Sequence, residues 1–472
     1  MARPTPLSGF PELLPEQRLV EQQVIDVLRT TFELHGFVGI ETRAVEPIDQ
    51  LLRKGDTSKE VYLLRRLHEE SAEGHSGIGL HFDLTVPFAR YVLENAGKLE
   101  FPFRRYQVQK VWRGERPQDG RYREFTQADI DVVGRDELPF HHDVEVTRVM
   151  VDALRRLSDP ATLGLPGFRL QVNNRKLIQG FYAGLGVAEG HQTDEVMRLV
   201  DKLDKLPAEK VHALLLTEAA IDASTADRVL ALATIRAEDA VGEQGFVRRV
   251  RDLGVEHPLL DEGLDELATL VRSVADLTSE QVRVVADLAI ARGLDYYTGT
   301  VFETRLDGYE SLGSICSGGR YDSLASDGRT TYPGVGISLG VSRVLVPLIA
   351  RTGLAADRKV PSAVLVALTD EESRPASEAV AGALRARGIP CEVAPTAAKF
   401  GKQIRYAERR GIPHVWFPQA DGPGQVKDIR TGEQVEADPA TWAPPTEDLR
   451  PQVVSTSSTD AVGSTNHVKE KQ

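Results

Sequence analysis

Cysteine is scarce in this chain of 472 residues, with only Cys316 and Cys391 present. No CxxC pair occurs, which argues against a cysteine-based zinc site and against a framework of disulfides. The first residues, MARPTPLSGFPELLPEQ, lack the apolar run of a signal peptide. No segment approaches the roughly 20 consecutive apolar residues that a membrane-spanning helix needs. These absences predict a cytoplasmic protein that has no membrane partner.

Net positive charge is also lacking, because 57 Lys and Arg stand against 70 Asp and Glu and give −13. A polyanion, however, binds through local charge, and residues 104–123 carry seven bases and two acids, a local charge of +5. Six of the seven bases are arginine, whose planar fork suits bidentate phosphate contacts. On composition alone, a solvent-exposed arginine-rich hairpin is the preferred interpretation. Arg292 and Arg343, in other segments, favour a phosphate site instead.

The common nucleotide-binding motifs are absent as well. The sequence contains no GxxxxGK[ST] loop, and Gly334, Gly336 and Gly340 have the spacing GxGxxxG, which does not match the dinucleotide fingerprint. A phosphorylated nucleotide would therefore have to be bound by arginines on a sheet. A suitable element is a long antiparallel hairpin predicted over residues 104–131, in which RPQDGRYR supplies the turn between two alternating segments.

The rest of the chain divides by its residue pattern. Residues 186–285 are rich in leucine, alanine and alternating charges, which predicts helices. Residues 291–320 are rich in β-forming residues, and GVGISLGVSRVLVPLIA predicts a glycine-rich strand that runs into a helix. Beyond a linker at 355–361, strands alternate with helices near 371–388 and 400–411, which predicts a small α/β domain with a mainly parallel sheet.

Several of these segments together resemble a known family. VWRGERP followed by GRYREF resembles motif 2 of class II aminoacyl-tRNA synthetases, GVGISLGVSRVL resembles motif 3, and the helix and strand that end at Pro47 are similar to motif 1. RGLDYYTGTVFE and SGGRYDSL resemble the two signatures of histidyl-tRNA synthetases. The resemblance covers residues 9–165 and 285–440.

The resemblance implies an α+β catalytic domain, an antiparallel sheet flanked by helices, which is split between residues 1–170 and 285–352. A mainly helical insertion at 171–284 would interrupt it. An α/β anticodon-binding domain is expected at 358–445, followed by a disordered tail at 450–472. Because motif 1 of this class builds a dimer interface, we also expect a homodimer.

The implied reaction activates L-histidine with ATP to histidyl-adenylate and transfers the histidyl group to the 3′-terminal ribose of tRNA(His). By resemblance, Arg113 and Arg292 are catalytic cations at the α-phosphate, where two anions must approach each other. Glu115 and Phe125 would bind the adenine. The outer phosphates would be held by Arg121 and Arg343, with Mg²⁺ bridging them.

The same resemblance implies a histidine pocket. Asp131 and Tyr297 would bind the ring, with Tyr296 alongside. The residues implied for the ammonium group and its surroundings are Asp83, Leu84, Thr85 and Gln127. Asp83 and Asp131 are one methylene shorter than the glutamates that are common at these family positions. A pocket that pairs every polar atom of histidine would reject similar amino acids strongly.

Contacts with tRNA are expected at two places. Arg116 and Gln118 lie in the turn of the hairpin. Lys402, Arg405 and Arg409 share one face of a helix through i, i+3, i+7 spacing. A solvated basic helix explains the second group almost equally well.

Two other functions are compatible with parts of this pattern. A catalytic-domain paralogue serves as a regulatory subunit of ATP phosphoribosyltransferase, but it usually lacks the C-terminal domain and degrades the arginine–tyrosine signatures. A histidine- or tRNA-sensing module fused to a kinase is the other, but no kinase signature occurs here. No metal site built from protein side chains alone is expected, because the neighbouring histidines have no supporting cysteines and no HExxH pattern.

Overall fold

The computed structural model describes residues 4–52, 60–67, 77–160, 162–290, 296–419 and 423–455. The chain forms two compact units. Unit 1 consists of Met1–Pro11, Ile25–Pro160 and Gly164–Val344, and unit 2 of Glu12–Val24, Ala161–Leu163 and Leu345–Gln472. Helices α1 (Pro15–Leu34) and α11 (Val341–Thr352) are each divided between the two units.

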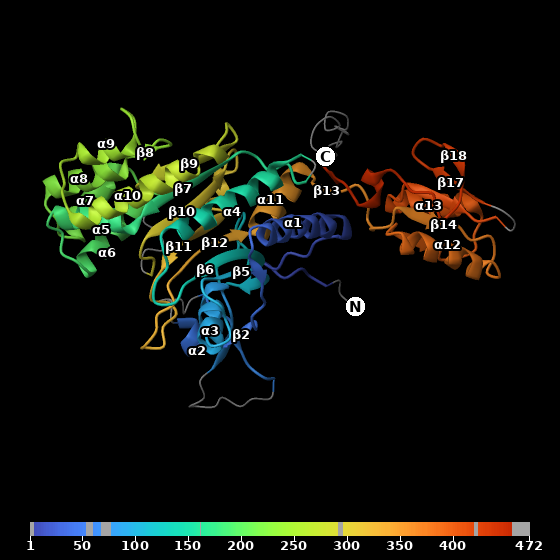
Figure 1. Cartoon of the computed structure of the whole chain (residues 1–472), viewed down its shortest axis with the longest axis horizontal. Coiled ribbons are helices and arrows are strands. Elements are labelled where there is room, and N and C mark those ends of the chain that lie inside the picture. Colours follow the sequence, from blue (N-terminus) through green and yellow to red (C-terminus); the bar gives the residue numbers. More distant parts are fainter. Residues whose placement is uncertain are drawn as a thin grey trace, which may run out of the picture. The chain divides into compact units, whose positions relative to one another are not determined.

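A nine-stranded sheet forms the centre of unit 1 (Figure 1). In spatial order, its strands are β1 (Val38–Gly39), β5 (Phe103–Trp112), β6 (Glu124–Val133), β12 (Gly334–Gly340), β11 (Cys316–Tyr321), β10 (Thr300–Leu306), β7 (Phe168–Asn174), β9 (Val282–Asp287) and β8 (Arg236–Ala237). Only the pairs β1–β5 and β7–β9 are parallel among these described strands. The predicted fold class is confirmed, with a mixed sheet in which antiparallel pairs dominate.

Helices and a small sheet accompany the large sheet. Helix α4 (His141–Ser158) packs on β6 and β12, and α3 (Thr85–Asn95) follows the loop that carries Asp83. The small sheet has the order β2 (Val45–Pro47), β4 (Ile78–Leu80) and β3 (Leu63–Leu64), next to the short helix α2 (Ile48–Leu51).

Strands β5 and β6 form the hairpin that the sequence predicts over residues 104–131. They pair antiparallel along their whole length, from Phe103 opposite Val133 to Trp112 opposite Glu124. Successive residues of a strand point to opposite faces of the sheet, so Gln127, Asp129 and Asp131 share one face. That face carries the site described below.

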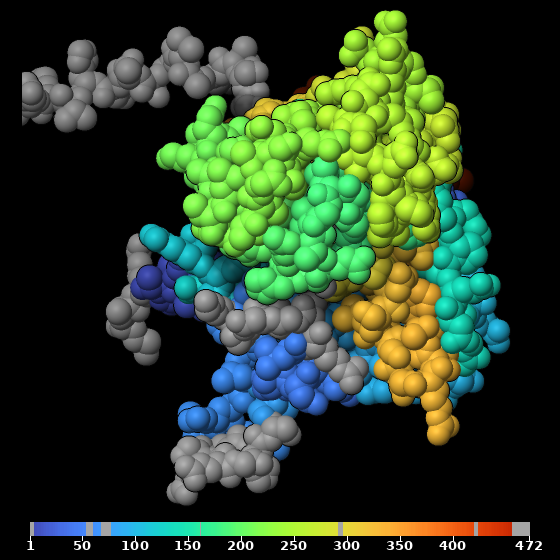
Figure 2. Space-filling model, turned by 90° about the vertical axis from the view of Figure 1, so that its left-hand side faces the viewer, coloured from blue at the N-terminus to red at the C-terminus, as the bar shows by residue number. Residues whose placement is uncertain are grey.

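A group of helices lies between β7 and β9 in the sequence, which confirms the helical content predicted for residues 186–285. They are α5 (Arg175–Gly184), α6 (His191–Val200), α7 (Ala208–Thr217), α8 (Ala223–Ala233), α9 (Phe246–Arg251) and α10 (Pro258–Ser273). Figure 2 shows them as one lobe of green to yellow atoms. The limits implied for the insertion, 171 and 284, fall inside β7 and β9, so both ends belong to strands of the large sheet.

Unit 2 contains the predicted α/β arrangement. Its sheet has the order β15 (Cys391–Val393), β14 (Val364–Val366), β16 (His414–Phe417), β17 (Gly424–Asp428) and β18 (Gln434–Ala437). The first three strands are parallel, and β17 and β18 form an antiparallel hairpin. Helices α12 (Arg374–Ala386) and α13 (Phe400–Arg410) connect the parallel strands, as the sequence predicts.

The segment implied as a disordered tail begins at residue 450. Its start instead forms a strand, β19 (Val453–Val454), which pairs with β13 (Ala355–Ala356). Residues 456–472 lie outside the described residues.

Candidate active site

The floor of the site is built from cross-strand rows on one face of the large sheet. One row runs from Arg105 on β5 through Asp131 on β6 and Gly336 on β12 to Gly319 on β11. The next row consists of Gln107, Asp129, Ser338, Ser317 and Glu303, from β5 to β10. Residues directly opposite each other in a ladder lie on the same face. Both rows therefore combine charged or polar side chains on β5 and β6 with small residues on β11 and β12.

The small residues leave room for the larger ones. A methyl group at Gly336 would come within 2.1 Å of an Asp131 carboxylate oxygen, and one at Gly319 within 2.7 Å of the Tyr297 ring. A residue with a Cβ atom at either position would displace these side chains. Glycine is therefore required at Gly336 and Gly319 if Asp131 and Tyr297 are to lie over this face of the sheet.

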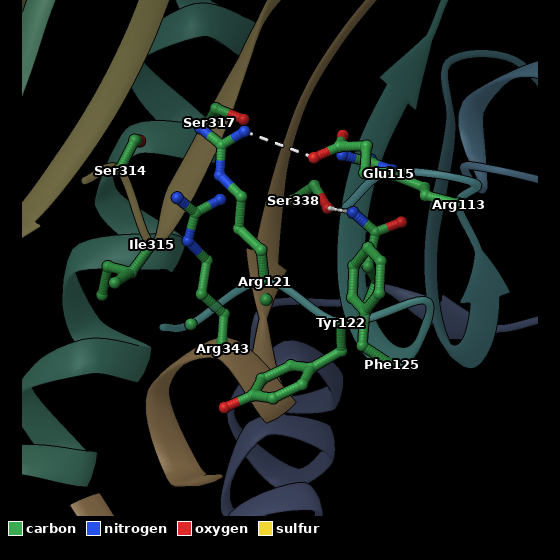
Figure 3. A pocket seen from close by; sticks show the side chains of 13 residues that line it. Arg113, Glu115, Arg121, Tyr122, Phe125, Ser314, Ile315, Ser317, Ser338 and Arg343 are labelled. Atoms are coloured by element: carbon green, nitrogen blue, oxygen red, sulfur yellow. Dashed lines mark hydrogen bonds and ion pairs between the residues drawn. The ribbon is translucent and has the colours of Figure 1, made fainter. Parts of the chain in front are cut away.

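One cavity over this face, about 160 Å³ in volume, is rich in arginine and is called the arginine cavity here. It is lined by Arg113, Glu115, Gly120, Arg121, Tyr122, Phe125, Gln127, Ser314, Ile315, Ser317, Ser338, Gly340 and Arg343. Figure 3 shows Arg121 and Arg343 extending in the same direction, with the Phe125 ring across the cavity from them. All five side chains that the resemblance implies for ATP (Arg113, Glu115, Arg121, Phe125 and Arg343) line it.

Each of the three arginines that line this cavity has a polar contact that orients its guanidinium group. Arg113 donates from Nε to the Phe82 carbonyl at 3.0 Å, and its guanidinium lies 5.2 Å from the centre of the Phe125 ring. Arg343 donates to the Leu312 carbonyl. Arg121 forms an ion pair of 3.3 Å with Glu115.

The cavity concentrates positive charge. Burial, followed by the charges of Arg121 and Arg113, lowers the pKa of Arg343 to about 10. Arg343 therefore remains protonated near pH 7, and three guanidinium groups repel one another unless an anion lies between them. The arrangement suits a polyphosphate, which presents several anionic oxygens to arginine forks.

A second cavity of about 70 Å³ adjoins the first and is lined by carboxylates; it is called the acid cavity here. Its lining consists of Asp83, Thr85, Arg113, Gln127, Asp129, Asp131, Tyr296, Tyr297, Ser317, Gly318, Gly319, Tyr321, Gly336, Ile337 and Ser338. Arg113, Gln127, Ser317 and Ser338 line both cavities. Six of the seven residues implied for histidine binding meet here. Leu84 is the exception, since it is fully buried and does not line the cavity.

Both carboxylate oxygens of Asp131 are engaged inside the protein. Oδ1 accepts a hydrogen bond of 2.7 Å from the Tyr321 hydroxyl, and Oδ2 lies 2.6 Å from the Arg105 guanidinium. Arg105 is fully buried and lies 4.3 Å from the centre of the Phe88 ring. Asp131 therefore belongs to a buried ion pair as well as to the cavity wall.

Asp129 has a different environment. It is 2% exposed, and its Oδ1 atom has no hydrogen-bond partner among the described residues. Burial raises its pKa to about 7, against the charge of Arg105 and with a further increase from Asp131. Ser338 forms a hydrogen bond with the carboxylate and accepts one of 2.9 Å from Gln127. The Gln127 Oε1 atom is buried and, within the described part of the chain, also without a partner.

Asp83 and the two tyrosines complete the acid cavity. Asp83 Oδ1 accepts a hydrogen bond of 3.1 Å from the Val86 backbone N–H in the first turn of α3. The rings of Tyr296 and Tyr297 lie 4.1 Å apart. Burial raises the pKa of Tyr296 well above its usual value, so its hydroxyl stays protonated and able to donate a hydrogen bond.

The remaining implied site residues lie elsewhere. Arg292 is outside the described residues. Arg116 and Gln118 are exposed on the turn between β5 and β6. Lys402, Arg405 and Arg409 are exposed on α13 in unit 2, as their spacing predicts.

Asp129, Arg105 and Tyr321 were not identified as site residues from the sequence. Asp129 could have been found, because its position two residues from both Gln127 and Asp131 places all three on one face of a strand. Tyr321 lies in the quoted signature SGGRYDSL, but its contact with Asp131 joins segments 190 residues apart.

Two further results concern ions and membranes. The part of the chain that the structure describes contains no group of three or more His, Cys, Asp or Glu side chains that could hold a metal ion. Within the same residues, no helix has the length and apolar character required to cross a bilayer.

Comparisons with known proteins agree with this geometry. The family model for histidyl-tRNA synthetase matches residues 9–344, and that for the anticodon binding domain matches residues 362–439. The histidine–tRNA ligase of Cutibacterium acnes is 58% identical, and the alignment covers 97% of this chain and 100% of the relative. The histidine–tRNA ligase of Micrococcus luteus is 56% identical over 96% of this chain and 99% of the relative.

A solved structure is similar over most of its length. The crystal structure of histidyl-tRNA synthetase from Nostoc sp. PCC 7120 has a TM-score of 0.76 and 33% identity, and the match covers 93% of this chain and 97% of that chain. The family model spans well over half of the sequence, and the relatives align along almost all of it. The chain therefore belongs to the histidyl-tRNA synthetase family.

Proposed function

We propose that the chain ligates histidine to tRNA(His) and that the two cavities are its substrate sites, ATP in the arginine cavity and histidine in the acid cavity. The supporting observation is that cavities of opposite charge adjoin along β6 and β12 and share Arg113. A polyphosphate suits the first cavity, and an amino acid with an ammonium group and a ring N–H suits the second. Substrates bound in this way would meet at Arg113.

In the first step, the histidine carboxylate attacks the α-phosphorus of ATP, an acyl–phosphate bond forms, and pyrophosphate leaves. Two anions approach each other in this step, so a cation placed between them lowers the barrier. Arg113 lines both cavities and is the described residue placed for this role. Arg292, by family resemblance, would be the second cation.

The roles proposed for the other side chains follow from the cavity that each of them lines. Arg121 and Arg343 would hold the β- and γ-phosphates, while Phe125 and Glu115 would contact the adenine. Asp83, Thr85 and Gln127 would bind the ammonium group. The described residues provide no cage of three acidic or histidine ligands, so we propose that Mg²⁺ is held largely by the phosphates of ATP.

In the second step, a hydroxyl of the terminal ribose of tRNA attacks the histidyl carbonyl, an ester bond forms, the acyl–phosphate bond breaks and AMP leaves. Arg116 and Gln118 on the exposed turn between β5 and β6 are proposed to contact this RNA. Lys402, Arg405 and Arg409 on α13 are proposed to contact another part of it. These basic side chains supply local positive charge in a chain whose net charge is −13. We further propose a homodimer in the cytoplasm.

The decisive experiment is histidine-dependent exchange of labelled pyrophosphate into ATP. Exchange that requires L-histidine supports the proposal. Histidine binding without exchange would instead favour the regulatory-subunit or sensor function.

A second experiment tests the proposed domain roles. Removal of residues 358–472 should leave the exchange rate largely intact and abolish charging of tRNA. Normal charging by the truncated chain would contradict the assignment of this segment to anticodon binding.

A further inference from the structure

A buried ion pair lies behind the acid cavity, on the opposite face of the large sheet. Arg320 belongs to the segment SGGRYDSL and lies on β11 between Gly319 and Tyr321, which both line the cavity. Because side chains alternate along a strand, the Arg320 side chain points to the other face. There it pairs with Asp143 in the first turn of α4, the helix that packs on β6 and β12.

The pair has the geometry of an arginine fork. Arg320 Nη2 lies 2.5 Å from Asp143 Oδ2, and its Nε atom donates to the same oxygen at 3.1 Å. Asp143 is fully buried, and Arg320 is 8% exposed. The attraction inside such a pair is largely offset by the cost of removing both charges from water, so apolar residues of similar volume would often stabilise a fold equally well. The pair is therefore better explained by the geometry that it imposes on its neighbours.

These neighbours include the short segment that follows the two tyrosines of the first signature. The Thr300 hydroxyl donates to Asp143 Oδ1 at 2.6 Å, and the Thr298 backbone N–H donates to the Arg320 carbonyl at 2.8 Å. A methyl group at Gly299 would come within 2.9 Å of the Arg320 Cδ atom, so this glycine packs directly against the arginine. Three consecutive residues are thus in contact with the ion pair.

Two aromatic side chains of the acid cavity are bonded through the backbone to this arrangement. Tyr297 directly precedes the segment, and its ring lies over Gly319. Tyr321 directly follows Arg320, and its hydroxyl donates to Asp131 in the cavity wall at 2.7 Å. A displacement of Arg320 would therefore move a tyrosine of each signature.

We propose that Asp143 and Arg320 are positioning residues of the histidine site: from behind the sheet, their ion pair fixes the segment 298–300 and the two tyrosine rings next to it. The inference rests on the proposed assignment of the acid cavity to histidine. Neither residue of the pair lines the acid cavity or the arginine cavity. Of these two cavities, only the acid cavity is lined by Tyr297 and Tyr321, so the pair should affect the KM for histidine and not the KM for ATP.

The first test compares Asp143→Asn with Glu145→Gln, a control two residues later on the same helix. Glu145 also pairs with an arginine, at 2.7 Å from Arg104 Nε, but that arginine lies on β5, outside both signatures. In pyrophosphate exchange, Asp143→Asn should raise the KM for histidine about tenfold and leave the KM for ATP within about twofold, because a charge-assisted contact is lost behind one cavity only. Glu145→Gln should leave both KM values unchanged. A pair that only stabilised the fold would lower the melting temperature without changing either KM.

A second variant decides the question if Asp143→Asn does not fold. Thr300→Val keeps the ion pair and the shape of the side chain but cannot donate to the carboxylate. We expect the KM for histidine to rise about threefold to fivefold, with an unchanged KM for ATP and a melting temperature close to that of the unaltered chain. The matched control is Thr304→Val, since Thr304 is fully buried on the same face of β10, and this variant should keep both KM values.

The outcomes separate the inference from the proposed function. If the unaltered chain shows no exchange that depends on histidine, the proposed function fails, and the inference fails with it. If the unaltered chain exchanges but Thr300→Val keeps its KM for histidine, only the positioning role is overturned. An equal rise in the KM values for histidine and ATP would also overturn this role, because the effect would not be confined to the acid cavity.

Discussion

The arginine cavity and the acid cavity share strands β6 and β12, yet they stabilise their charges in opposite ways. In the arginine cavity, three arginines line one space, and only Arg121 among them forms an ion pair within the described residues, with partly exposed Glu115. In the acid cavity, Asp131 is paired with a fully buried arginine. The first cavity keeps its charge available for a polyanion, whereas the second neutralises much of its charge internally. The difference teaches that neighbouring cavities on one sheet can treat charge differently, one leaving clustered cations for a polyanionic ligand and the other pairing most of its acidic groups within the protein.

The largest expected effect concerns the buried ion pair between Arg105 and Asp131 in the wall of the acid cavity. Arg105→Met leaves Asp131 without a cation, so the free energy of unfolding should fall by about 3–5 kcal/mol. Urea unfolding measures this change. The matched control is Arg104→Met on the same strand, whose 2.7 Å pair with Glu145 is partly exposed and should contribute about 1 kcal/mol or less. If the free energy of unfolding falls equally in the two variants, the buried ion pair does not contribute more to stability than the partly exposed one.

The second prediction concerns Arg113, the arginine that lines both cavities. Arg113→Ala should lower the exchange rate by roughly 10²- to 10³-fold, because the charge on the transition state loses a fixed donor. Arg116→Ala, three residues later on the exposed turn, is the control and should exchange pyrophosphate normally. A small effect at Arg113 would show that its position between the cavities has no catalytic consequence.

The third prediction concerns the repulsion between the guanidinium groups of the arginine cavity, which a bound anion should relieve. Pyrophosphate should stabilise the chain against heat by about 2.7 kcal/mol when its concentration is 100 times its Kd. Arg343→Ala should lose most of this stabilisation, and Arg351→Ala, exposed near the other end of the same helix, should keep it. If pyrophosphate stabilises the Arg343 variant fully, the clustered arginines are not its binding site.

The smallest effect is a pH dependence confined to the acid cavity. The pKa of Asp129 is raised to about 7, so the carboxylate gains a proton and the acid cavity loses a negative charge that favours an ammonium group as the pH falls below that value. A triazole analogue of histidine, whose ring does not gain a proton in this range, should therefore bind up to about tenfold more weakly for each pH unit below 7. Fluorescence or calorimetric titration from pH 8 to pH 5 measures this affinity. In Asp129→Asn the decline should vanish, and an identical decline in both proteins would assign it to another group.

Much of the fold could be predicted from local patterns. The β5–β6 hairpin, the helices between β7 and β9, and the alternation of strands and helices in unit 2 all follow from periodicities of 2 or 3.6 residues and from turn residues. The limits of the helical insertion were less accurate, because the pattern does not show that β7 and β9 join a sheet whose other strands lie far away in the sequence.

The sequence by itself determined which side chains are chemically able to act, namely the arginines of the hairpin, Arg343, Asp83, Asp131 and the two tyrosines of the first signature. It also determined that Gln127, Asp129 and Asp131 share a face, because side chains alternate along a strand. Only the tertiary structure decided their partners. The turn between β5 and β6 fixes the register that places Arg105 beside Asp131. The pairing of β6 with β12 and β11, by contrast, joins segments about 200 residues apart and brings Tyr321 to Asp131, which no local pattern encodes.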